Sequence, residues 1–281
     1  MLERTASSVS EILVNVHEIL QIWGISEADT DLYFRGINKA SCTLLPRLYR
    51  PENLTLDERN LFYRFQVQAL SHLSQRPSSD WEWYFIAQHY GLPTRLLDWT
   101  ENLFVGVYFA LYDIVRNKSF EEVISSQTAP LPESSGAQDG PVIWILDADD
   151  LNRVTAGDAS SFIPEGDFTA EWLPENIEKG KPHQVDDEDG TVTNEKPIAL
   201  LPPRTTNRII AQQGVFTIHG TGVEPLESYY GSGESERLAR IIISPQAVGK
   251  VWRDLLLCGV HHFAVFPELD KLSEYIVHIL K

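Results

Sequence analysis

The sequence predicts an α+β fold in which N-terminal helices pack on a mixed central sheet. Two observations favour this class. Apolar residues recur at helical spacing through most of residues 9–114, whereas short apolar runs typical of strands come mainly after residue 141. The two kinds of segment show little regular βαβ alternation. The 281 residues are enough to bury a sizeable core and could form one large domain or two small ones. We expect a single domain over residues 1–281.

The first helix is predicted over residues 9–23. Ser8 and Glu11 have the spacing of a capping box. Gly24 follows the last apolar position and supplies a stop. This helix is expected to be scaffold.

A short strand is predicted over residues 32–36. It ends in Gly36, which frees the backbone and would let a ligand approach closely. A second helix is expected to begin with a capping box formed by Thr55 and Glu58.

The third helix is predicted from a cap at Ser79 or Asp80 as far as Gly91. A fourth covers residues 103–114, with Tyr108 among its inward-facing side chains.

The middle of the chain changes composition. Residues 127–140 are predicted to form a surface loop, and residues 142–146 (VIWIL) a central strand. An acidic, loop-rich insertion follows at about residues 152–198. A solvated surface loop is the first interpretation, and a lid over a substrate is the alternative.

Short strands are then predicted at residues 199–201, 208–211, 215–219 and 239–243. Ser244 and Pro245 begin a helix that runs to Cys258, and a last helix follows Pro267.

Composition favours a soluble cytoplasmic protein. No apolar run reaches the roughly 20 residues of a membrane span, and the first residues do not resemble a secretory signal. Cys42 and Cys258 are expected to be reduced thiols, and neither has metal-ligand spacing around it. A net charge of −17 makes bulk nucleic-acid binding unfavourable.

Six of the chain's arginines nevertheless lie in or beside a few unusual strings, at positions 35, 47, 50, 95, 204 and 208. A small arginine cluster on an acidic body suits a compact anion, such as a phosphate-bearing small molecule or a short single strand. In residues 88–110, Arg95 and Asp98 lie within otherwise apolar sequence. They are expected either to form an internal ion pair or to line a pocket.

Individual residues leave alternatives open. Arg35 could bind phosphate or brace the fold by pairing with Asp98. His89 and Tyr90 end a helix, where His89 could act by capping alone. Asp98 and Thr100 could cap the fourth helix or contact a ligand, and the two roles are compatible.

Gln212 and Gln213 interrupt an apolar run that is predicted to be strand. Neighbouring strand residues point to opposite faces, so at most one of the two amides would face a pocket. Gly214 is expected to mark a bulge or a close approach of backbone or ligand.

Four strings stand out together: Phe34-Arg35-Gly36, HYGLPTRLLDWT at residues 89–100, RIIAQQGVF at 208–216 and CGVHHFAVFPELD at 258–270. They resemble the FRG domain family, which is named for its Phe-Arg-Gly signature. The resemblance implies a single FRG-type domain, often found in bacterial and phage-defence settings, whose activity is largely uncharacterised.

The order of these strings is similar in outline to ADP-ribosyltransferase-like folds. By that analogy Arg35 holds dinucleotide phosphates, Trp99 or Tyr90 stacks on a ring, and Thr100 bonds a ribose. Gln213 stands where such enzymes place a catalytic Glu, so Asp98 or Glu101 would supply the carboxylate.

The resemblance therefore implies NAD as ligand and an ADP-ribosyltransferase or NAD glycohydrolase toxin, with no metal. The predicted catalytic residues are Arg35, His89, Asp98 and Gln213, and the predicted ligand-binding residues are Arg35, Tyr90, Arg95, Trp99, Thr100 and Gln212. One alternative is a non-enzymatic sensor or interaction module that binds a protein partner of the same defence or toxin-antitoxin system. A nuclease that uses His89, Arg35 and Arg95 is the second alternative.

Overall fold

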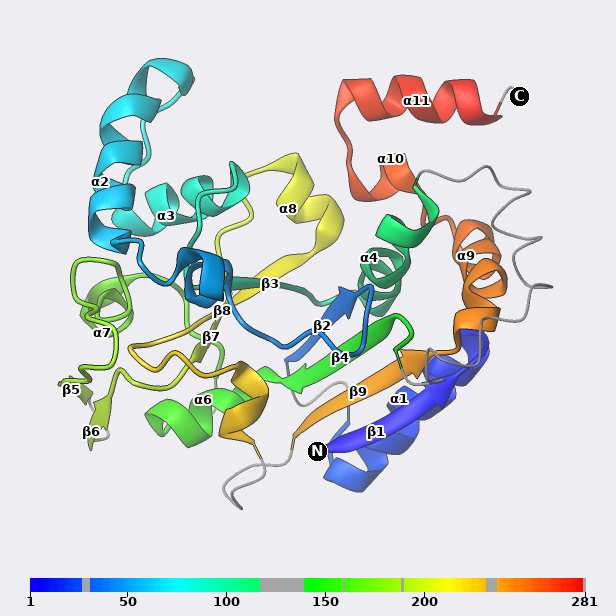
Figure 1. The fold of residues 1–281 in the computed structure, drawn as a ribbon, viewed down its shortest axis with the longest axis horizontal. Coiled ribbons are helices and arrows are strands. Elements are labelled where there is room, and N and C mark those ends of the chain that lie inside the picture. Colours follow the sequence, from blue (N-terminus) through cyan, green and yellow to red (C-terminus); the bar gives the residue numbers. More distant parts are fainter. Residues whose placement is uncertain (27–30, 117–138, 159, 188–189, 231–236, 280–281) are drawn as a thin grey trace.

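The computed structural model describes residues 1–26, 31–116, 139–158, 160–187, 190–230 and 237–279. Within these residues the chain forms a seven-stranded mixed sheet, a separate two-stranded hairpin and ten α-helices (Figure 1). The α+β prediction is confirmed. Most of the predicted surface loop at residues 127–140 lies outside the described residues.

The main sheet brings together strands from both ends of the chain. In spatial order its strands are β1 (Leu2–Ala6), β9 (Leu238–Ile243), β4 (Val142–Asp147), β2 (Leu32–Ile37), β3 (Leu96–Thr100), β8 (Gly214–Ile218) and β7 (Ile198–Leu200). Only β1 and β9 are parallel, and the other neighbours are antiparallel. β1 was not predicted, because LERTA has too few apolar residues to show a strand pattern.

Helices cover the sheet in layers. The α-helices are α1 (Val9–Trp23), α2 (Glu58–Ala69), α3 (Asp80–His89), α4 (Leu103–Val115), α6 (Ala148–Ala156), α7 (Gly166–Ala170), α8 (Asn207–Gln212), α9 (Val248–Leu257), α10 (His262–Val265) and α11 (Leu269–Ile279). Buried side chains of α1, α4 and α9 form one core cluster with those of β2, β4 and β9. The predicted packing of N-terminal helices on the sheet is therefore seen for α1 and α4 (Figure 1).

Helix starts were predicted with mixed success. Ser8 and Ser79 cap α1 and α3 as predicted. α2 is capped by Asp57 instead of Thr55, and α4 by Asn102 instead of Asp98 or Thr100. Asp98 and Thr100 lie in β3 instead, because the apolar run before α4 forms a strand.

The prediction of a strand at residues 208–211 is wrong. This run belongs to helix α8, which Thr206 caps by accepting the Ile209 N–H. A short apolar run does not by itself distinguish a helix from a strand, and here the Thr206 cap favours the helix. Gln213 ends the helix in the left-handed region, at φ 46°.

The interpretation of the acidic middle segment as a surface loop is wrong for much of its length. It contains most of α6, all of α7, and a hairpin of β5 (Gln184–Asp187) and β6 (Gly190–Thr193). Trp172 is fully buried in a core cluster with side chains of α2, α3 and β8. Leu173 is buried in the same cluster, and Phe162 and Phe168 pack against it, so a few large apolar residues hold this polar segment on the core.

Two neighbouring strands diverge near the middle of the sheet. β2 and β3 share a single register pair, Phe34 with Thr100. β2 then continues along β4, whereas β3 continues along β8 (Figure 1). The divergence interrupts the ladder and leaves room for a cleft between the strands.

Candidate functional site

A cleft of about 900 Å³ lies where β2 and β3 separate. Residues 34–38 line one side of the opening, and residues 96–100 line the other. The segment from residue 41 to residue 52, the end of α3, and parts of α4 and α8 complete the walls.

The cleft brings together most, but not all, of the predicted site residues. Those that line it are Arg35, His89, Asp98, Trp99, Thr100 and Gln212. Tyr90, Arg95 and Gln213 are not among its lining residues.

Arg35 crosses the gap between the diverging strands. Its Nη1 donates a hydrogen bond to the backbone carbonyl of Asp98, and it lies 3.8 Å from Oδ2 of the same residue. Its Nε is buried without a hydrogen-bond partner in the structure. Burial lowers the pKa of the guanidinium, opposed by the nearby Asp98. Arg35 is thus a brace that retains one unused donor beside the cleft.

Gly36 has a different role from the predicted one. A Cβ atom there would lie 2.0 Å from the carbonyl oxygen of Gly106 and 2.3 Å from the amide nitrogen of Ala110. The missing side chain therefore lets α4 pack directly on β2. The glycine of the signature serves helix–strand packing.

A chain of polar side chains holds the carboxylate of Asp98. Gln88 Nε2 donates to both Asp98 oxygens at 3.1 Å. The Thr94 hydroxyl in turn donates to Gln88 Oε1 at 2.5 Å. The Asp98 side chain remains 62% exposed, so its carboxylate is oriented by the protein but open to solvent and to a ligand.

His89 supplies an exposed imidazole at the C-terminal end of α3. Partial burial and the nearby Arg208 lower its pKa, more than Glu268 and Asp98 raise it. The ring is consequently neutral near pH 7 and has a nitrogen that can accept a proton.

The guanidinium of Arg208 lies 4.7 Å from the ring centre of Phe266.

Arginines outnumber acids around the cleft. The arginines are Arg35, Arg47, Arg50 and Arg208, and the acids are Glu52, Asp98 and Asp113. Arg47 donates to the Gly91 carbonyl at 2.8 Å, while Arg50 makes a longer bond of 3.4 Å to Leu45. The cleft is locally cationic in a chain of net charge −17.

Trp99 and Thr100 are already bonded within the protein. Trp99 Nε1 donates to the Thr217 hydroxyl at 3.0 Å, and the residue is 4% exposed. The Thr100 hydroxyl donates to the Gln212 carbonyl at 2.6 Å and accepts the Asn102 N–H at 3.0 Å. These contacts fix β3 to β8 and α8, while both residues also line the cleft.

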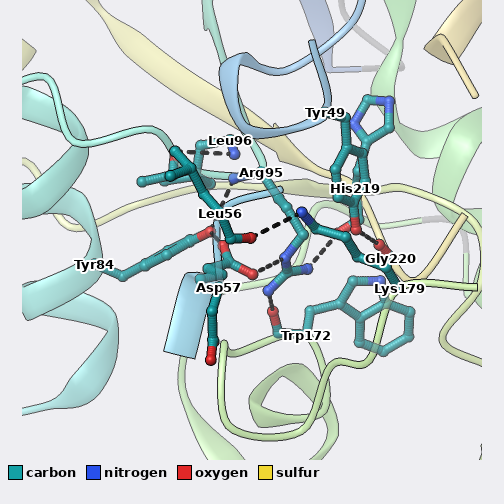
Figure 2. Close-up of polar contacts among 12 residues, drawn as sticks. Tyr49, Leu56, Asp57, Tyr84, Arg95, Leu96, Trp172, Lys179, His219 and Gly220 are labelled. Atoms are coloured by element: carbon teal, nitrogen blue, oxygen red, sulfur yellow. Dashed lines mark hydrogen bonds and ion pairs between the residues drawn. The ribbon is translucent and has the colours of Figure 1, made fainter. Parts of the chain in front are cut away.

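Arg95 lies at the centre of a closed, buried network (Figure 2). Its Nε donates to the Glu58 carboxylate at 2.6 Å, and its two Nη atoms donate to the carbonyls of His219 and Trp172. The Tyr84 hydroxyl donates to Glu58 and accepts the Arg95 N–H. The sequence predicted that Arg95 and Asp98 either form an internal ion pair or line a pocket. Arg95 does form an internal ion pair, but its partner is Glu58 instead of Asp98.

Tyr90 and Gln213 are also placed away from the cleft. Tyr90 is 68% exposed and lines a separate groove. Gln213 is the left-handed C-terminal residue of α8, and its carbonyl accepts the Glu101 N–H at 3.0 Å. The Gln212 amide donates to the Val265 carbonyl at 3.2 Å, so the Gln212 side chain serves the local structure.

Sequence reasoning did not select Gln88, Arg47, Arg50 or Arg208 as site residues, although all four line the cleft. The clustering of arginines was the available signal for three of them. No sequence signal marked Gln88, because its role depends on its contact with Asp98 in the next strand.

Comparison with known proteins bears on the family of the chain. Residues 30–119 match the model of the FRG domain family. This confirms the FRG resemblance. The FRG match includes β2, α2, α3, β3 and α4, and so spans the cleft's two central strands and the Arg95 network. No curated protein and no solved structure matches the chain.

No group of three or more His, Cys, Asp or Glu side chains is placed to hold a metal ion within the described part of the chain. Among the same residues, no helix is both long and apolar enough to cross a membrane.

Proposed function

We propose that the cleft between β2 and β3 binds a small phosphate-bearing ligand, with an NAD-like dinucleotide as the leading candidate. The observation that carries the proposal is Arg35 Nε, which is buried beside the cleft without a hydrogen-bond partner. A buried donor normally has a partner, and a ligand oxygen would provide one. Guanidinium groups match the geometry of phosphate oxygens.

The cleft's size and charge agree with this ligand. Its volume of about 900 Å³ is within the usual range for small-molecule sites. Arg47, Arg50 and Arg208 add positive charge on its walls. Phe109 and Tyr112 also line it and offer partly exposed aromatic surface near these charges.

An NAD-consuming activity would use Asp98 and His89. When the bond between the ribose and nicotinamide breaks, its electron pair leaves with nicotinamide, and the Asp98 carboxylate would stabilise the positive charge that develops on the ribose. A water or acceptor hydroxyl then bonds to the same carbon and gives its proton to neutral His89. This ADP-ribosyltransferase-like chemistry is the enzymatic form of the proposal.

A non-enzymatic sensor is the second candidate function. It is favoured by the observation that the side chains of Trp99 and Thr100, which the analogy places on the dinucleotide, form hydrogen bonds within the protein. In that case the cleft binds its ligand without turnover.

The two cysteines allow a direct test of occupancy. Cys42 lines the cleft, whereas Cys258 lies beyond the end of α9 and outside it, and both are exposed. We would measure the iodoacetamide alkylation rate of each thiol by peptide mass spectrometry, with NAD, ADP-ribose, ATP or unphosphorylated nicotinamide riboside. The proposal predicts that phosphate-bearing compounds slow alkylation of Cys42 several-fold and leave Cys258 unchanged.

Variants connect the protection to the arginines. Arg50→Glu and Arg208→Glu should each weaken ligand binding about tenfold or more, equal to about 1.4 kcal/mol. Arg253→Glu, on an exposed position of α9, is the matched control and should bind normally. Equal alkylation of Cys42 with and without millimolar ligand would reject the cleft as a phosphate site. Nicotinamide release measured by chromatography in the same samples separates the enzyme from the sensor.

A further inference from the structure

A second hollow lies along α2 and is separate from any function proposed above. This groove, of about 550 Å³, runs between α2 and the residues that follow α3. We name it the α2 groove. Its apolar lining is Leu61, Phe65, Ala69, Leu73 and Leu92, and its polar or exposed lining is Arg64, Gln68, His72 and Tyr90.

The apolar floor of the α2 groove is continuous with the protein core. Phe65 packs edge-on against Trp83, with ring centres 6.4 Å apart, yet Phe65, Leu73 and Leu92 all remain partly exposed. Tyr90 stands at the border with 68% of its surface exposed. Apolar surface that forms a continuous recess is typical of a binding site for another chain.

The spacing of the floor residues follows the helix. Leu61, Phe65, Ala69 and Leu73 succeed one another at intervals of four residues along α2 and the turn after it. Twelve residues of helix extend about 18 Å, so the groove is long enough for about three turns of a second helix. A bound helix would need apolar residues on one face only.

Charge identifies the kind of helix. Residues 59–79 contain Arg59, Arg64 and Arg76 but no Asp or Glu, in a chain of net charge −17. All three arginines are exposed. The one acidic residue within α2 is Glu58, which is buried and paired with Arg95. The exposed part of the helix after it therefore carries arginines without carboxylates, and an occupant with carboxylates beside its apolar face would be attracted.

We propose that the α2 groove binds an acidic amphipathic helix from a partner protein. Its apolar stripe fills the floor formed by Leu61, Phe65 and Leu73, and its carboxylates lie against Arg64 on the groove wall. A symmetric pair of α2 helices from two copies of this chain would instead bring arginines together. A nucleic acid would find one arginine and a mainly aliphatic floor in the groove itself.

The α2 groove also borders the ligand cleft. Leu92 lines both hollows, and the two residues that precede Tyr90 and Leu92, His89 and Gly91, line the cleft. A partner helix in the groove would therefore contact the back of a cleft wall.

Selection from a random helical peptide library displayed on phage tests the proposal. The full chain is the bait, and two further baits carry Arg64→Glu or Tyr90→Ala, both at exposed positions. Arg253→Glu is the matched charge control, and thermal melting of each bait confirms folding. The expected peptides have net negative charge with apolar residues at intervals of three and four. They should bind Arg64→Glu and Tyr90→Ala at least tenfold more weakly, and Arg253→Glu normally.

Other outcomes would overturn the proposal. These are enriched peptides that are neutral or basic, or acidic peptides whose binding is unchanged by Arg64→Glu and Tyr90→Ala. The same proteins are tested on vesicles containing phosphatidylserine and on a 20-nucleotide RNA. Loss of either interaction in the α2 variants, without peptide enrichment, would assign the groove to a membrane or a nucleic acid instead.

Discussion

Two arginines within the FRG match, Arg35 and Arg95, differ in how the protein satisfies the hydrogen-bond donors of a buried guanidinium. Arg95 is fully buried, and its side chain bonds to one carboxylate and two carbonyls of the protein. Arg35 makes one hydrogen bond across a gap between strands and keeps a buried Nε without a partner. The closed network stabilises the fold, whereas the open one leaves a donor for a ligand.

The comparison shows that an unusual charge in apolar sequence does not by itself indicate a binding site. What distinguishes the two residues is the number of their donors that the protein itself satisfies. In the closed region, Glu58 and two backbone carbonyls accept from the guanidinium, and Tyr84 donates to Glu58. Replacing Arg95 should therefore reduce mainly the stability, whereas replacing Arg35 should reduce mainly the ligand affinity.

The largest expected effect is on the closed network. Arg95→Met leaves the Glu58 carboxylate buried without its cation, and we expect the free energy of unfolding to fall by about 3–5 kcal/mol. Guanidinium denaturation measures the loss. In the double variant Arg95→Met, Glu58→Leu, part of the stability should return, because no uncompensated charge remains. An unchanged denaturation midpoint in Arg95→Met would show that the network is not closed as described.

A substitution beside Arg35 separates packing from ligand access. Gly36→Ala would place a methyl group against the backbone of α4, and we expect a loss of about 1–3 kcal/mol from overpacking. Gly24→Ala is the control for backbone strain alone, since a methyl there meets open space at φ +68° and costs roughly 1–2 kcal/mol. If Gly36→Ala were fully stable but failed to bind ligand, the glycine would belong to the site after all.

Acid should weaken the closed region through His219. Its pKa is lowered from 6.5 to about 3 by complete burial and by Arg95. The unfolded chain therefore takes up a proton below pH 6.5, while the folded chain keeps the ring neutral down to about pH 3. Stability from this residue is fully present above pH 6.5 and is lost as the pH falls, by about 1.4 kcal/mol per pH unit inside that window.

Denaturation at pH 7, 6, 5 and 4 checks this slope. In His219→Gln, the free energy of unfolding should depend less steeply on pH, because nearly one proton fewer is taken up on unfolding. His89→Gln is the matched change in the open cleft, where partial burial also lowers the pKa, and it should flatten the curve less. Equal slopes for the wild type and His219→Gln would mean that the buried ring is protonated in the folded chain.

Much of the fold could be predicted from the sequence because its signals are local. The caps Ser8 and Ser79 and the apolar spacing of α1 and α4 depend on neighbouring residues. The failures lie where a distant contact decides. Trp172 orders the acidic segment by reaching a core built from α2 and α3, and β1 forms only by pairing with a strand from the other end of the chain.

The candidate site divides in the same way. Arg35 and Asp98 were predicted as a possible pair, and the structure brings them together. Glu58, 37 residues before Arg95, could not be identified as its partner from one sequence, because nothing local marks it. The bonds that occupy Thr100 and Trp99 come from Gln212 and Thr217, more than 100 residues later.

The smallest expected change in stability, with the largest change in binding, belongs to Arg35. Arg35→Ala removes one hydrogen bond to a carbonyl, and we expect a loss of about 1–2 kcal/mol, below that of Arg95→Met. Because the same change removes the buried Nε, binding of NAD or ADP-ribose should fall by more than tenfold under the proposed function. Isothermal calorimetry on folded protein gives the affinity, and denaturation gives the stability. Arg95→Met, measured below its melting temperature, should show the reverse pattern, with affinity kept and stability lost. If both variants lost stability and neither lost affinity, Arg35 would be only a brace, and the ligand would have to be sought outside the gap between β2 and β3.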